Sequence, residues 1–185
     1  MPVLPVLAYG VTGFVAYPGS PTLTPDTFAS VVREIVDSLY GQGFRRVLVA
    51  NGHSGNPPEH PSISGWNASN PEGELLWHEV WDGPPDELAA EIDAEYDHAS
   101  WSENFPWTRL PDAPSPSARK PPMVPPAVDT PEAWREALGD GSFGGLYQRD
   151  DEDALRVWDA AVEQLRERLE HGWSRPGPGR AEPAS

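Results

Sequence analysis

The chain has 185 residues, of which 38% are hydrophobic and 23% charged, a balance typical of a globular protein with a sizeable core. Its 29 acidic residues outnumber the 13 basic ones, and the formal charge of −16 disfavours binding to nucleic acid or to an anionic membrane surface. Because the chain has no cysteine, disulfides, thiolate zinc sites and cysteine nucleophiles are excluded, and any metal needs His, Asp or Glu ligands.

The N-terminal third predicts a parallel sheet. Residues 1–7 are uncharged and interrupted by proline, which indicates neither a signal peptide nor a membrane span, so we expect a cytoplasmic protein. The expected elements are a strand at 3–8, a Gly- and Pro-rich loop at 9–25, a helix that begins after Thr24 or Asp26 and ends at Gly41 or Gly43, and a strand at 44–50. This order is a βαβ-like unit, which predicts an α/β fold with a parallel sheet covered by helices.

The remaining two thirds contain fewer regular elements, because many of the 23 prolines lie there. We expect a strand at 75–81, a short helix at 88–92, an ordered proline-rich arm at 106–131, a long helix at 150–171 and a disordered tail at 174–185. Residues 1–173 are therefore predicted to form a single α/β domain.

The sequence NGHSGN at residues 51–56 directly follows the apolar strand at 44–50. In α/β folds, ligands bind beyond the carboxyl ends of parallel strands, where glycines let the backbone turn sharply. His53 is therefore the first candidate for a functional residue. A purely structural, hydrogen-bonded histidine explains this motif about as well.

A second candidate region is the sequence EYDHASWSE at residues 95–103. Histidine and carboxylate ligands can hold a zinc or manganese ion while leaving a position for a water whose pKa the ion lowers. An acidic surface turn would have the same composition, and the spacing alone does not distinguish the two.

Several separate segments, in this order, resemble the creatininase (creatinine amidohydrolase) superfamily. They are YGVT at 9–12, YPGS at 17–20, SL at 38–39, GFRR at 43–46, NGHSGN at 51–56, HASWSE at 98–103 and GSFGG at 141–145. The fifth is close to the family's NGHGGN signature, and HASWSE is similar to its HAGxxETS segment. The resemblance covers most of residues 5–170.

The resemblance implies a layered, parallel-sheet creatininase-like fold, oligomerisation, and a dinuclear zinc or manganese site, with iron as a further choice. It implies that the site hydrolyses an amide-like bond of a small molecule. If the roles of the matching family positions are transferred to this chain, His53 and Glu103 would be metal ligands and His98 would act as catalytic acid/base. Glu95 would be an acidic group facing the substrate. We add Ser54 and Trp101 as candidate substrate contacts. Asn51 and Asn56 would hold the loop.

The chain also departs from the family pattern. It begins just before the YGVT segment, so the family's N-terminal part, with a Glu, a His-Gly-x-His element and an Asp for the metal pair, has no counterpart here. Val15 stands where a family histidine is expected, and Asn104 and Phe105 replace a Thr-Ser pair. The prolines at 57–61 displace the helix expected after the NGHSGN motif. We therefore expect an N-terminally truncated fold whose metal site another chain completes, because two or three ligands rarely retain a dinuclear site.

Three functions remain open at this point. The first is a metal-dependent amidohydrolase that shares its site with a creatininase-like subunit, in a hetero- or homo-oligomer. The second is a catalytically degenerate partner subunit that stabilises an active homologue. The third is a small-molecule binding module whose cleft is lined by tryptophans, namely Trp66, Trp77, Trp81 and Trp101, although core packing explains these residues better. We favour the first.

Overall fold

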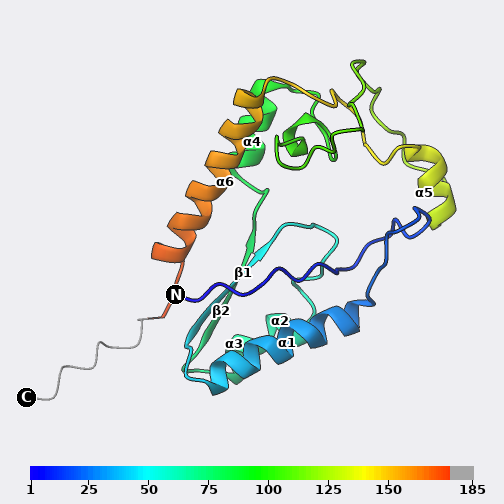
Figure 1. The fold of residues 1–185 in the computed structure, drawn as a ribbon. Coiled ribbons are helices and arrows are strands. Elements are labelled where there is room, and N and C mark those ends of the chain that lie inside the picture. Colours follow the sequence, from blue (N-terminus) through cyan, green and yellow to red (C-terminus); the bar gives the residue numbers. More distant parts are fainter. Residues whose placement is uncertain (176–185) are drawn as a thin grey trace, which may run out of the picture. The chain divides into compact units, whose positions relative to one another are not determined.

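The computed structural model describes residues 1–175, and the chain divides into two compact units (Figure 1). Unit 1 comprises residues 1–13 and 21–80 together with the C-terminal part from residue 165. Unit 2 comprises residues 14–20 and 81–164. Within residues 1–175, no helix is both long and apolar enough to cross a membrane.

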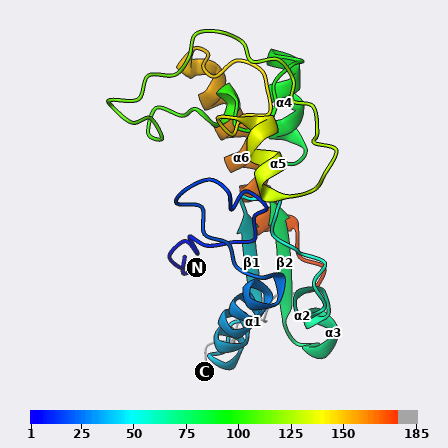
Figure 2. The same ribbon diagram turned by 90° about the vertical axis from the view of Figure 1, so that its right-hand side faces the viewer.

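Unit 1 contains a parallel pair of strands, β1 (Arg46–Asn51) and β2 (Glu74–Glu79), which lie side by side in Figure 2. They pair in register from Arg46 opposite Glu74 to Asn51 opposite Glu79, so both carboxyl ends lie at the same edge. The predicted parallel sheet is therefore confirmed, with strand bounds within two residues of those expected.

Helix α1 (Pro25–Gly41) covers one face of this strand pair. The Thr24 side chain accepts a hydrogen bond from the Thr27 amide, and proline at the first helical position needs no amide partner, so the helix begins where the sequence predicts. Its apolar stripe forms the core of unit 1 with residues from α2, α3 and β2. The buried members are Phe28, Ala29, Val32, Val36, Ile63, Trp66 and Leu75.

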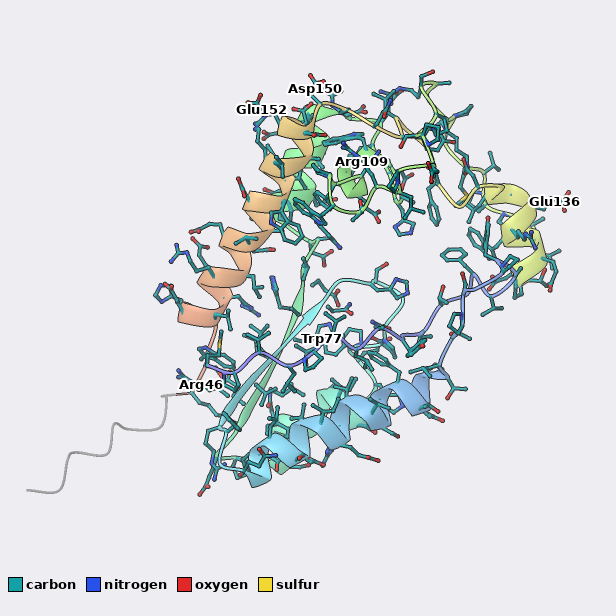
Figure 3. The ribbon with its side chains drawn as sticks, viewed as in Figure 1. Arg46, Trp77, Arg109, Glu136, Asp150 and Glu152 are labelled. Carbon is teal, nitrogen blue, oxygen red and sulfur yellow. The ribbon has the colours of Figure 1, made fainter. Side chains whose placement is uncertain are left out.

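Residues 172–175 pack on strand positions that alternate with those facing α1. A Cβ built on Gly172 would lie 3.2 Å from Cδ2 of Leu76, and the Arg46 guanidinium lies 5.3 Å from the Trp173 ring (Figure 3). The amide and hydroxyl of Ser174 both donate to Glu74 at 2.8 Å. The expected disorder is thus wrong for Ser174 and Arg175, because buried Glu74 needs their hydrogen bonds, whereas 176–185 lie outside the described residues.

One further expectation for unit 1, the strand at 3–8, is wrong. Residues 3–8 form no strand, and their apolar side chains stay exposed, at 84% for Val3 and 90% for Val6, so no burial stabilises pairing there. After the NGHSGN motif, the short helix α2 (Pro61–Ser64) begins within the proline segment, because Pro61 occupies the first helical position and His60 caps it. The short helix α3 (Trp66–Ser69) follows.

Unit 2 is built from helices and long connections. It contains α4 (Pro84–Ile92), a 3₁₀ turn η1 (Trp101–Glu103), α5 (Pro131–Leu138) and most of α6 (Asp151–His171), whose residues from 165 belong to unit 1. Ala89, Trp101 and Val157 form its buried core. Asp150 and Glu152 lie at the start of α6 (Figure 3), where acidic side chains favourably meet the helix dipole. The predicted long helix is confirmed, but α5 was not expected.

Candidate functional site

His53 lies just beyond the carboxyl end of β1, in the loop that the NGHSGN motif forms. Its ring is half-buried, and Nε2 lies 2.8 Å from the main-chain oxygen of Val11. A carbonyl oxygen only accepts hydrogen bonds, so Nε2 carries a hydrogen here, and in the neutral ring Nδ1 then carries the lone pair. The ring therefore has a defined tautomer with one nitrogen available as a base or ligand.

Asparagine side chains hold the His53 loop to the strands. Buried Asn51 donates from Nδ2 to the His53 carbonyl at 2.8 Å and accepts at Oδ1 from Asn56 at 2.9 Å. Asn56 in turn accepts at Oδ1 from the Val11 amide at 3.0 Å. The Val11 carbonyl also accepts the hydrogen bond from His53 Nε2, so the hydrogen bonds form a closed ring through Val11, Asn56, Asn51 and His53. Asn51 and Asn56 thus hold the loop, as expected.

Two glycines are required where this loop meets residues 10–11. A Cβ at Gly55 would lie 2.5 Å from both His53 Nε2 and the Val11 oxygen, and a Cβ at Gly10 would lie 2.5 Å from Asn56 Oδ1. Both distances are far below contact range, so any side chain would displace the hydrogen-bonded groups themselves. The glycine spacing of the motif therefore has a steric cause, namely the close approach of the two segments.

The second candidate region, in unit 2, brings His98 and Glu103 together. Their Nδ1 and Oε1 atoms lie 3.3 Å apart, and each side chain is a little under half exposed. The same carboxylate oxygen accepts the Ala99 amide at 2.7 Å, which closes the turn through η1. Ala99 has a φ of +54°, an uncommon conformation for a residue with a Cβ.

Hydrogen bonding to Glu103 raises the pKa of His98 above its ordinary value, although partial burial of the ring acts in the opposite direction. The Phe143 ring packs edge-on against the imidazole, with centroids 5.0 Å apart, and the Phe143 amide donates to the His98 carbonyl at 3.1 Å. This arrangement gives His98 a larger protonated fraction near neutral pH, which suits a group that donates a proton to a leaving nitrogen.

The other predicted site residues lie in different surroundings. Glu95 is exposed and forms an ion pair with Arg119 at 2.9 Å, and Arg119 also binds buried Asp93. Ser54 is exposed on the His53 loop. Trp101 is completely buried, so a substrate would reach it only if its surroundings opened. The roles assigned to these residues stay predictions.

The tryptophans of the proposed binding cleft mainly pack. Trp66 is 1% exposed in the core of unit 1 and donates from its indole to Asp37 at 2.7 Å. Trp77 packs edge-on against Phe28 of α1 (Figure 3), and Trp81 stacks on Phe105 in unit 2. These contacts fit the packing explanation of the tryptophans better than an open aromatic cleft.

The predicted metal ligands are not part of a complete metal site within residues 1–175. No group of three or more His, Asp or Glu side chains in this part of the chain is arranged to hold a metal ion. His53 already bonds the Val11 carbonyl, and Glu103 is engaged by His98 and the Ala99 amide. A metal would therefore need ligands beyond those that each unit brings together here.

A protein-family model described as Creatininase: Creatinine amidohydrolase matches residues 1–169. The chain belongs to the creatininase family. The expected fold is therefore confirmed, and it is the fold of metal-dependent amidohydrolases. The match includes both histidine regions described above. No curated protein matches the chain.

Solved structures of the creatininase family show the same fold at low identity. A putative creatinine amidohydrolase from Bacteroides fragilis NCTC 9343 is 19% identical with a TM-score of 0.65, and the match covers 91% of this chain and 72% of that one. A mutant creatininase complexed with creatine is 17% identical with a TM-score of 0.65, covering 88% and 74%. A mutant creatininase of the Zn-Zn type is 16% identical with a TM-score of 0.58, covering 83% and 67%.

Two residues of these regions were not expected from the sequence. Glu79 ends β2 and accepts Asn51 Nδ2 at 2.6 Å, and Phe143 packs on His98. The sequence could have indicated Glu79, because it lies near the carboxyl end of the second predicted strand. The carboxyl ends of neighbouring parallel strands lie side by side, so this carboxylate lies next to the loop that follows the first strand. Phe143 is distant in sequence from His98, and no local pattern predicts their contact.

Proposed function

We propose that this chain is a subunit of a metal-dependent hydrolase of the creatininase type, which cleaves an amide-like C–N bond of a small molecule. The observation that carries the proposal is the family match over residues 1–169 together with a histidine at the carboxyl end of β1 whose ring nitrogens are distinguished by a hydrogen bond to Val11. The solved relatives include a zinc-containing creatininase and one complexed with creatine.

The metal site of this enzyme would be completed by another polypeptide, because the described residues do not assemble three ligands. In this proposal, His53 of unit 1 and Glu103 of unit 2 are each a metal ligand. A divalent ion of zinc, manganese or iron would supply an activated water when bound.

The chain's own contribution to the chemistry would be proton transfer. His98, held at Nδ1 by Glu103, would deliver a proton to the leaving nitrogen, and its raised pKa keeps more of that proton available. Glu95 would face the substrate only after release from Arg119, which binds it at 2.9 Å. Ser54 and Trp101 remain proposed substrate contacts, with Trp101 requiring an opening of the unit 2 core.

The proposal is tested on the full chain, expressed alone and then with the products of neighbouring genes. Native mass spectrometry and elemental analysis give subunit and metal content, and hydrolysis of a panel of cyclic and linear amides gives activity. We expect metal and activity only in an oligomer with a creatininase-like subunit, and loss of both on His53→Ala. His171→Ala is the matched control, because that histidine is exposed near the end of α6.

A second function is favoured by one specific observation, the lack of a three-ligand group within residues 1–175. In this alternative the chain is a catalytically degenerate subunit that stabilises an active creatininase-like homologue. It predicts an assembly whose metal content and activity survive His53→Ala unchanged. A metal-free assembly without activity under any condition would also contradict the hydrolase proposal.

A further inference from the structure

The carboxylate of Glu79 lies where the two strands of unit 1 end. Glu79 is the register partner of Asn51, so their side chains emerge next to each other from the carboxyl ends of β2 and β1. One carboxylate oxygen accepts Asn51 Nδ2 at 2.6 Å, and the other accepts the Trp77 indole Nε1 at 2.6 Å. Trp77 itself packs against Phe28 of α1, so the carboxylate is tied to the core.

Asn51 transmits this anchor to the histidine loop. Its Nδ2 group has two hydrogens, and the two acceptors are Glu79 and the His53 carbonyl at 2.8 Å. With both hydrogens used, the Asn51 amide has one orientation, which points Oδ1 at Asn56. Asn56 Oδ1 accepts a hydrogen bond from the backbone amide of Val11, and the Val11 carbonyl accepts one from His53 Nε2.

Only an acceptor suits the position of Glu79. Both of its partners donate, so a carboxylate satisfies both at once. Glutamine has the same shape but would turn its NH₂ group toward one of the two donors, which leaves that donor unpaired. The charge also strengthens both hydrogen bonds, as expected for a carboxylate that accepts from neutral donors.

We infer that Glu79 is a positioning residue for His53, acting through Asn51 to hold the ring with Nε2 toward Val11 and the Nδ1 lone pair available to a ligand. Glu79 touches neither the ring nor a reacting group. The functional meaning of the inference rests on the proposed hydrolase, in which His53 binds the metal. The tautomer itself is a property of the chain alone.

The test uses the full metal-free chain labelled with ¹⁵N in histidine, in the presence of a chelator. The ¹⁵N shifts of the His53 ring distinguish the two neutral tautomers, and assignment comes from the signals lost in His53→Ala. We expect one Nε2-protonated form in the wild-type chain. Glu79→Gln and Asn51→Ala should each give a mixture of tautomers, and the double variant should add nothing to the larger single effect.

Glu74→Gln is the matched control. Glu74 is also a carboxylate on β2, but it lies at the amino end of the strand and binds Ser174 and Arg175. This variant should lower stability while leaving the His53 signals unchanged. The inference is overturned if Glu79→Gln remains folded with unchanged ring signals, or if Glu74→Gln alters them equally.

If Glu79→Gln does not fold, the wild-type chain still gives an answer. Solvent exchange of the Asn51 side-chain amide should be slow, because both hydrogens are bonded at a buried position. Fast exchange of either hydrogen would contradict the anchor.

Activity of the assembled enzyme separates this inference from the proposed function. Glu79→Gln in an active assembly should lose roughly 10- to 100-fold in activity or metal affinity, the usual effect of removing a partner that orients a ligand. An inactive assembly with the expected tautomer effects would overturn the hydrolase proposal and leave the positioning role intact. If the assembly is active and the ¹⁵N signals of the His53 ring do not change in Glu79→Gln, the positioning role alone is overturned.

Discussion

The two histidine regions of this chain are held in contrasting ways. His53 in unit 1 bonds a main-chain carbonyl, and neutral amide side chains link its loop to Glu79 at the strand ends. His98 in unit 2 instead pairs with one carboxylate across 3.3 Å in a turn that is nearly half exposed. One histidine thus depends on buried hydrogen-bond geometry, and the other depends on charge.

This difference predicts different sensitivities. A buried hydrogen-bond network loses stability whenever one member is removed, since the remaining donors and acceptors are left without water. A half-exposed ion pair is screened by solvent and salt, so its loss costs little but changes the protonation of the histidine. Mutations in unit 1 should therefore alter folding, and mutations in unit 2 should alter titration.

The largest effect is expected for Trp77→Ala. The substitution removes both the edge contact with Phe28 and the indole that donates to Glu79 at 2.6 Å. We expect a loss of about 3 kcal/mol of unfolding free energy, as for large aromatic truncations in a core. Chemical denaturation measures it. Trp107→Ala in unit 2 is the control, because Trp107 is 54% exposed. An equal loss of unfolding free energy in Trp107→Ala would contradict the difference expected between the two units.

Asn51→Ala should have the next largest effect. Asn51 is 5% exposed and bonds Glu79, Asn56 and the His53 carbonyl, so its removal leaves several partly buried groups unpaired. We expect a loss of about 2 kcal/mol, in the range found for unsatisfied buried polar groups. Glu103→Ala, measured by the same denaturation, should cost about 1 kcal/mol or less. A greater cost for Glu103→Ala would reverse the comparison.

A smaller effect of opposite sign is expected at Ala99, which precedes the 3₁₀ turn of unit 2. Its φ of +54° disfavours any residue with a Cβ by about 1 kcal/mol, whereas glycine adopts it freely. Ala99→Gly should therefore stabilise the chain by about 1 kcal/mol if the Glu103 carboxylate still accepts the residue 99 amide.

Ala89→Gly is the control for that substitution. Ala89 is buried in the helical α4, where glycine should cost about 1 kcal/mol. The two alanine-to-glycine changes should thus have opposite signs in thermal unfolding. Destabilisation by Ala99→Gly would show that the turn does not hold this strained conformation in solution.

Local patterns predicted the elements that bury a continuous apolar face. Helices α1 and α6 and strands β1 and β2 follow from periodicity, caps and the glycines that end them. The strand expected at 3–8 is absent, because an apolar run becomes a strand only when a partner is available, which is a non-local condition. Arg175 shows the converse, since its guanidinium donates to the carbonyls of Asn67 and Asn70 although composition alone suggested disorder.

For the candidate site, too, local motifs were predictable from the sequence and contacts between distant residues were not. His53, His98 and Glu103 could be named as candidates because each lies in a motif that is contiguous in sequence, whereas the contact between His98 and Glu103 was not predicted. Glu79 and Val11 contact the His53 loop from 28 and 42 residues away, and only the register of two parallel strands brings the first of them close. Motifs therefore supplied the candidate residues, whereas the residues that contact them from distant parts of the chain required the fold.

The smallest expected effect on stability is the pH dependence of the His98 pair, although it distinguishes the two regions best. The hydrogen bond to Glu103 raises the pKa of His98, so the folded state holds the proton more tightly than the unfolded chain. The pair therefore contributes stability below about pH 6.5, the ordinary histidine pKa, and loses it as pH rises through the folded-state pKa. Because both side chains are almost half exposed, we expect no more than a few tenths of a kcal/mol.

An NMR titration of the imidazole protons checks this directly. Glu103→Gln should lower the pKa of His98 and weaken its dependence on salt, because of the two carboxylates that raise this pKa only Asp97 remains. Unchanged titration of His98 in Glu103→Gln would mean that its proton is held by something other than the carboxylate. Metal binding through the Glu103 oxygen beside His98 would then not compete with holding the His98 proton.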